Sequence, residues 1–141
     1  MAFAFALLAL AGCERREPAP ALESSGPDQE RVTLGASFVG ADSSRLRHLL
    51  HSDLVVQPPA PDSALGGAAA IEYLLQLAAN TSVAESRLQT GAMAREGSFL
   101  FEKGLWLLRE GDLALQAGYT LRWRETPGGW QVVLWRWNPF R

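Results

Sequence analysis

The chain has 141 residues, enough for one ordinary domain but too few for two. Hydrophobic residues make up 48% and charged residues 20%, which is typical of a globular domain, so a wholly disordered chain is excluded. The formal net charge of -2 gives no basic excess, and we therefore expect no nucleic-acid partner. All five tryptophans follow Leu105, which predicts that the C-terminal third holds the aromatic core or a binding surface.

The first residues have the character of an export signal. Residues 2–11 form an apolar run as long as a signal-peptide core and too short to span a membrane. Its end, Leu10-Ala11-Gly12-Cys13, resembles the lipobox of bacterial lipoproteins, which implies that the Cys13 thiol carries a lipid. No positive residue precedes Cys13, unlike a typical signal peptide; the alternative is an apolar tail with a free buried thiol. In such lipoproteins Glu14 after the cysteine favours the outer membrane, facing the periplasm.

A polar segment separates this signal from the folded part. Residues 14–28 are rich in Pro, Glu and Ser and contain one large apolar residue, Leu22, too little to offset the entropy of ordering. We therefore predict a signal peptide at 1–13, a disordered tether at 14–30 and one folded domain at 31–141.

In the first half of the domain the sequence predicts short helices and strands. Residues 31–41 fit a strand or a helix about equally well. A short helix is expected over 44–50, with Asp42 or Ser43 as its N-cap, and then a strand over 54–57 that stops at two prolines. Helical spacing of apolar residues over 71–78 predicts the most regular helix of the chain.

The second half predicts a meander of strands. Apolar residues alternate through 113–123, which indicates a strand with one buried face. Gly-containing turns at 110–112 and 126–129 flank this strand, and the neighbouring strands are expected at 98–109 and 130–137. Helices followed by an antiparallel meander make the fold class α+β.

Several short sequence motifs, found in order along 46–138, carry a family resemblance. They are LLHSDLVV at 49–56, the glycine before Ala70-Ile71, GYTLRW at 118–123, GGWQVV at 128–133, and the closing Trp137-Asn138. This stretch resembles the NTF2-like (SnoaL-like) superfamily, of the DUF4440 type. The resemblance implies a cone in which a curved antiparallel sheet wraps around N-terminal helices. It does not imply one function, because this fold hosts isomerases, dehydratases, cyclases, dioxygenase subunits and many proteins without known chemistry.

The resemblance also suggests where a ligand would lie. Side chains near the open end of the cone would line a pocket for a small hydrophobic molecule, and the candidates are Trp106, Tyr119, Trp123 and Trp137. Non-covalent binding of such a ligand is the function we predict. The outer face of the sheet commonly dimerises in this superfamily, so a homodimer is expected through that face. A purely structural interaction domain, with the cone filled by its own side chains, is a third reading.

An enzyme of the isomerase, cyclase or dehydratase kind is the main alternative. The position of the steroid-isomerase base falls on Pro58, which cannot act as a base. The catalytic candidates are Glu102 or Asp53, with Tyr119 as a hydrogen-bond donor. A desolvated Glu102 inside the cone could act as an acid or base. Apolar residues occur on both faces of the strand at 98–109, however, so the sequence does not decide whether Glu102 points into the cone or away from it. We predict no catalytic residue and no cofactor.

Two charged sets have ordinary explanations. His48 and His51 lie near a predicted helix end, where they suit its dipole, and no third ligand is visible, so we predict no metal. Arg122, Arg124 and Arg136 are expected on the outer face of adjacent strands. They could bind an anionic partner or a lipid headgroup, or form a solvated face balanced by Glu96 and Glu125. The predicted membrane contact is through lipidated Cys13.

Overall fold

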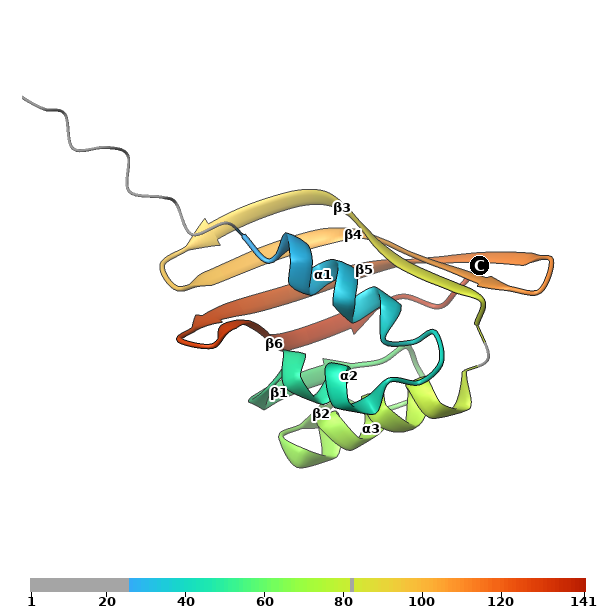
Figure 1. Cartoon of the computed structure of the whole chain (residues 1–141), viewed down its shortest axis with the longest axis horizontal. Coiled ribbons are helices and arrows are strands. Elements are labelled where there is room, and N and C mark those ends of the chain that lie inside the picture. Colours follow the sequence, from blue (N-terminus) through green and yellow to red (C-terminus); the bar gives the residue numbers. More distant parts are fainter. Residues whose placement is uncertain (1–25, 82) are drawn as a thin grey trace, which may run out of the picture.

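The computed structural model describes residues 26–81 and 83–141. Within these ranges three helices lie against one six-stranded sheet. The helices are α1 (Asp28–Ala36), α2 (Ser43–Leu49) and α3 (Ala68–Asn80). The strands are β1 (Leu50–Gln57), β2 (Leu65–Gly66), β3 (Glu85–Glu96), β4 (Phe99–Glu110), β5 (Leu113–Thr126) and β6 (Gly129–Trp137). The long strands bend across the molecule and all three helices lie on one side of them (Figure 1).

The sheet is mixed rather than antiparallel throughout. Its order is β2-β1-β6-β5-β4-β3, and the four strands from β3 to β6 form the predicted antiparallel meander. Strand β1, however, pairs in parallel with β6. A parallel pair needs a long connection between its strands, and here most of the domain lies between β1 and β6. The predicted antiparallel meander is therefore confirmed for β3 to β6, and the parallel pairing of β1 with β6 makes the sheet as a whole mixed.

Helix α1 includes the first part, 31–36, of the ambiguous segment at 31–41, and residues 37–41 form a turn. It begins at Asp28, so the last residues of the predicted tether at 14–30 belong to the folded domain. The helix is held by burial rather than by local composition: Arg31 and Leu34 are buried. Gly35 permits a close approach to β3, because a Cβ there would lie 3.2 Å from the backbone oxygen of Ser86.

The other predicted elements form with shifted ends. In α2 the side chain of Asp42 accepts a hydrogen bond from the backbone N–H of Arg45 at 3.1 Å, which confirms the predicted N-cap. The strand predicted over 54–57 begins earlier, at Leu50. Helix α3 contains the whole predicted segment 71–78. No helix in the described ranges is long and apolar enough to cross a membrane.

Aromatic side chains fill the interior of the curved sheet. All five tryptophans are buried, and Trp106, Trp123 and Trp135 are almost completely inaccessible. The ring of Trp106 lies 5.0 Å from Phe38 and 4.9 Å from Trp135, in edge-on and tilted contacts. Because these rings occupy the deep part of the cone, the core is packed with the chain's own side chains.

The register of β4 decides which of its residues face inward. Leu100, Glu102, Trp106 and Leu108 are buried, whereas Phe99, Phe101, Leu105 and Leu107 face the opposite side. Glu102 therefore lies on the helix-covered face. Gly104 makes room there: a Cβ at this position would lie 2.0 Å from the backbone oxygen of Gln89 and 2.9 Å from the Tyr119 hydroxyl.

Candidate functional site

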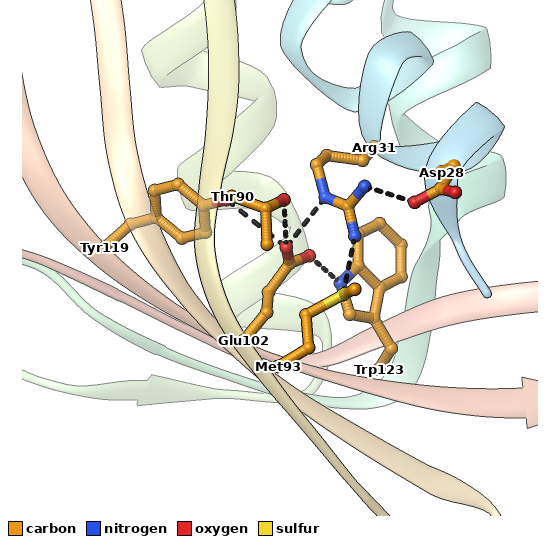
Figure 2. A network of polar contacts seen from close by, with 7 residues as sticks. All are labelled: Asp28, Arg31, Thr90, Met93, Glu102, Tyr119 and Trp123. Carbon is orange, nitrogen blue, oxygen red and sulfur yellow. Dashed lines mark hydrogen bonds and ion pairs between the residues drawn. The ribbon is translucent and has the colours of Figure 1, made fainter.

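A buried carboxylate, Glu102, is the centre of the main polar network. Glu102 is 1% exposed. On the neighbouring strands it is paired with Met93 of β3 and Leu121 of β5. Burying a carboxylate is costly unless charged and polar groups surround it, and here they do. Figure 2 shows donors from helix α1 and from strands β3 and β5 converging on it.

The two oxygens of Glu102 are both occupied. Oε2 accepts hydrogen bonds from Arg31 Nε at 2.7 Å, Thr90 Oγ1 at 2.9 Å and the Tyr119 hydroxyl at 3.3 Å. Oε1 accepts a hydrogen bond from the indole N–H of Trp123. The carboxylate is thus satisfied by the protein itself.

Arg31 connects this network to α1. Besides its ion pair with Glu102, it donates through Nη1 to Asp28 at 2.7 Å and lies 3.4 Å from the sulfur of Met93. Burial alone would lower the pKa of Arg31, but the hydrogen bonds to Asp28 and Glu102 outweigh it and raise the pKa above its ordinary value. The guanidinium is therefore a permanent charge that fixes the helix on the sheet.

Tyr119 is held in its protonated form. Burial and the negative charge of Glu102 together raise the pKa of Tyr119 to about 12. Its hydroxyl donates to Glu102 rather than to an open space. At neutral pH Tyr119 is therefore a hydrogen-bond donor whose proton is already bonded to Glu102.

The predicted catalytic candidates are only partly brought together. Glu102 and Tyr119 are in hydrogen-bonding distance, but Glu102 is only 1% exposed and does not border the largest of the described hollows, which has a volume of about 1010 Å³. A catalytic acid or base must contact its substrate, but both oxygens of this carboxylate already accept hydrogen bonds from protein groups. Asp53 is separate from the pair: its side chain is 79% exposed on β1, and its backbone N–H donates to His51 Nδ1.

The four predicted ligand-binding residues lie in the packed core. Trp106 and Trp123 are almost completely inaccessible, and Trp106 donates through its indole N–H to Ser86 at 3.0 Å. Tyr119 and Trp137 are also buried, although both border a small hollow on the outer side of the sheet. The tryptophans therefore fill the cone, and the open space lies elsewhere.

A larger groove opens at one end of the sheet, beyond the tryptophans. It has a volume of about 1010 Å³ and is bordered by the end of α1, the start of β3, the end of β4 and the start of β5. Apolar side chains form much of its wall, and polar ones stand among them; they include Val39, Ser86, Leu108, Arg109 and Leu115. Sequence reasoning missed this groove because its wall comes from distant segments. The partly exposed Val39 was its one local signal.

The two histidines lie in different elements of the fold. His48 lies near the C-terminal end of α2 and His51 in β1, where its Nδ1 is 3.8 Å from Asp53. In the described part of the chain no three His, Cys, Asp or Glu side chains lie close enough together to hold a metal ion.

Arg122, Arg124 and Arg136 share the outer face of the sheet, but Glu125, one of the two acidic residues expected to balance them, does not lie on that face. Register places Arg122 beside Phe101 and Leu134, and its guanidinium lies 3.9 Å from the ring centroid of Phe99. Glu125 instead pairs with Arg95 at 2.7 Å on the inner side. The expectation that Glu125 balances the outer face was wrong because strand alternation turns it inward.

Comparison with known proteins gives matches to solved structures only. No family model and no curated protein matches the sequence. An NTF2-like protein from Cytophaga hutchinsonii superposes with a TM-score of 0.62 at 15% identity, covering 78% of this chain and 90% of that one. A candidate ketosteroid isomerase from Parabacteroides distasonis gives 0.66 at 11% identity, with coverages of 85% and 92%. A candidate calcium/calmodulin-dependent protein kinase type II association domain from Thiobacillus denitrificans gives 0.66 at 19% identity, with coverages of 82% and 96%.

Proposed function

The chain has an NTF2-like fold, and we propose that it uses this fold to bind a small apolar or amphipathic molecule non-covalently. The proposed binding site is the groove at the end of the sheet. Its volume of about 1010 Å³ is the observation that carries the proposal, since small-molecule sites are concave and mostly apolar. Leu108 and Leu115 offer apolar surface, while Arg109 at the rim offers a polar contact.

Catalysis is less well supported than binding. One of the similar structures is described as a candidate ketosteroid isomerase, and the fold accepts such chemistry. In this chain, however, the one buried carboxylate among the described residues is Glu102, and protein donors already occupy it. The groove itself holds no such buried acid, which favours a binding role.

A substitution at the groove wall tests the proposal. Val39 borders the groove and is 39% exposed, so Val39→Trp should narrow it without disturbing the core. We expect the affinity for Nile red, a neutral apolar dye, to fall about tenfold as measured by fluorescence titration. Native mass spectrometry of protein from its own host, looking for a retained ligand, complements this measurement.

Val32→Trp is the matched control. Val32 is on α1, 72% exposed and outside the groove, so its replacement should leave dye affinity unchanged. If the unaltered protein neither binds the dye nor retains a ligand, the tryptophan-filled cone would be a structural interaction domain and the proposal fails.

We further propose that the domain works at the cell envelope, tethered through a lipid on Cys13. The support is the lipobox-like sequence at 10–13, which lies outside the described residues. Glu14 supports the outer membrane as the location. The described domain would then act on molecules of the envelope.

A further inference from the structure

A second hollow lies on the outer face of the sheet, away from the groove. Register places Lys103, Thr120 and Arg136 side by side on β4, β5 and β6. With Asn138 they border a hollow of about 290 Å³. This arrangement of two cations, a hydroxyl and an amide around one depression is formed only when the three strands pair.

Gly118 lets the Asn138 side chain lie close to the sheet at the edge of this hollow. A Cβ at Gly118 would lie 3.1 Å from Nδ2 of Asn138, which is closer than an ordinary van der Waals contact, so a larger residue there would displace the amide. The backbone N–H of Asn138 donates to the Gly118 oxygen at 2.9 Å, which holds Asn138 beside this position. The amide side chain is thereby kept at the rim.

Within residues 26–81 and 83–141, the donors at the rim have no partners of their own. Among the described residues, the side chains of Lys103, Thr120, Arg136 and Asn138 make no hydrogen bond or ion pair. No Asp or Glu borders the hollow. Two neighbouring cations without a carboxylate repel each other, so an anion placed between them would gain favourable interactions with both.

We propose that this hollow binds a phosphate group. The guanidinium of Arg136 can donate two parallel hydrogen bonds to phosphate oxygens, and Lys103 adds a compact charge. The Thr120 hydroxyl and the Asn138 amide supply further donors to a group that has several acceptor oxygens.

The surroundings indicate a phosphate ester with an apolar part. A neighbouring depression of about 480 Å³ shares Gly118 and Asn138 with the hollow and is bordered by Leu105 and Pro139. Leu105 is 40% exposed, so it can contact an alkyl group. A soluble alkyl phosphate and a phospholipid headgroup share this chemistry.

The outer face is less suited to a second copy of the chain. Across a two-fold axis the same patch meets itself, so the cations Lys103, Arg122 and Arg136 would face the same set of cations on the second copy. Like charges brought together this way are unfavourable. The homodimer expected through this face stays a prediction, and its formation is one outcome of the test below.

The test uses the full chain, labelled with ¹⁵N and titrated with hexyl phosphate. We expect saturable shifts at the amides of Gly118, Thr120 and Asn138. Lys103→Gln and Arg136→Gln should each weaken binding about tenfold, since each removes a charge-assisted contact. Gly118→Ala should also weaken binding, without a change in charge.

Arg124→Gln is the matched control, because it removes one positive charge from the same face but lies outside the hollow. It should change the affinity by about twofold at most. Equal losses in Arg124→Gln and Lys103→Gln, or shifts that never saturate, would overturn the proposal. So would shifts over the whole outer face that depend on protein concentration alone, which would indicate a homodimer.

Vesicles separate the two sources of the phosphate. Binding to phosphatidylcholine vesicles that contain phosphatidic acid, lost in Lys103→Gln, would support a lipid headgroup. Binding of hexyl phosphate without any preference for these vesicles would support a soluble ester. The Val39 variants leave this hollow intact, so failure here and failure of the groove proposal are distinguishable.

Discussion

At the scale of single residues, Tyr119 shows how position in a strand sets chemistry. Strand alternation turns its ring inward, and Gly104 on the neighbouring strand leaves room for the hydroxyl. There the hydroxyl meets Glu102, whose charge adds to burial in opposing ionisation of the phenol. Tyr119 therefore becomes part of the support for a buried carboxylate.

This placement predicts a pH dependence of stability. The pKa of Tyr119 is raised to about 12 in the folded chain, while an unfolded tyrosine ionises near pH 10. The unfolded state thus loses its proton first, and the stability from protonated Tyr119 should be complete below about pH 10 and lost as the pH rises to about 12. Urea unfolding at stepped pH measures this slope.

Comparison with a variant isolates the contribution of Tyr119. Tyr119→Phe should show a shallower loss of stability over the same pH range. The pKa of Tyr73 is also raised to about 12, by burial and by its hydrogen bond to Asp62, so part of the slope should persist. Identical slopes in the two proteins would contradict the assigned environment of Tyr119.

At the scale of elements, the docking of α1 is the main feature of the polar network. The helix contacts β3 closely at Gly35 and places Arg31 against Glu102 of β4. A guanidinium that reaches a fully buried carboxylate fixes both the position and the rotation of the helix. We infer that Glu102 is a structural residue whose partner comes from α1.

Removing Arg31 should be costly because it leaves a buried charge unpaired. We expect Arg31→Met to lower the free energy of unfolding by about 3 kcal/mol and to speed hydrogen exchange in α1. The double variant Arg31→Met with Glu102→Leu should be more stable than the sum of the single changes predicts. Chemical denaturation of the four proteins measures this coupling.

Asp28→Asn serves as the control for this cycle. The Asp28 side chain is 78% exposed, so losing its ion pair with Arg31 should change stability by less than about 1 kcal/mol. Additive effects of the Arg31 and Glu102 changes would show that the pair does not hold α1 on the sheet.

At the scale of the whole molecule, three regions of the sheet differ in structure. The inner face of the sheet is filled by aromatic rings, the groove opens at its end, and the cationic hollow lies on its outer face. The described chain begins beside α1, near the end of β3, as Figure 1 shows.

The anchor itself is testable through partitioning. In a diderm host, the full chain should enter the detergent phase of a Triton extract and incorporate labelled palmitate, because the acyl chains supply apolar surface. Cys13→Ser should stay in the aqueous phase and remain unlabelled. A Cys13→Ser protein that still partitions with detergent would contradict lipid attachment at this residue.

Much of the fold could be predicted because its signals are local. The alternation at 113–123 and the helical spacing at 71–78 are properties of neighbouring residues, and both elements formed as expected. The family resemblance then placed these elements in a cone, which the similar structures support. The candidate pair of Glu102 and Tyr119 also lies together, although without the open space that an enzyme would need.

The sequence by itself therefore determined the class of fold, the strand meander and the tryptophan-rich core. Only the tertiary structure decided the helical state of 28–36, the inward face of Glu102 and the parallel pairing of β1 with β6. The physical reason is the same for all three. Their energies come from contacts between segments far apart in the chain, such as Arg31 with Glu102, and no local pattern records a contact of that kind.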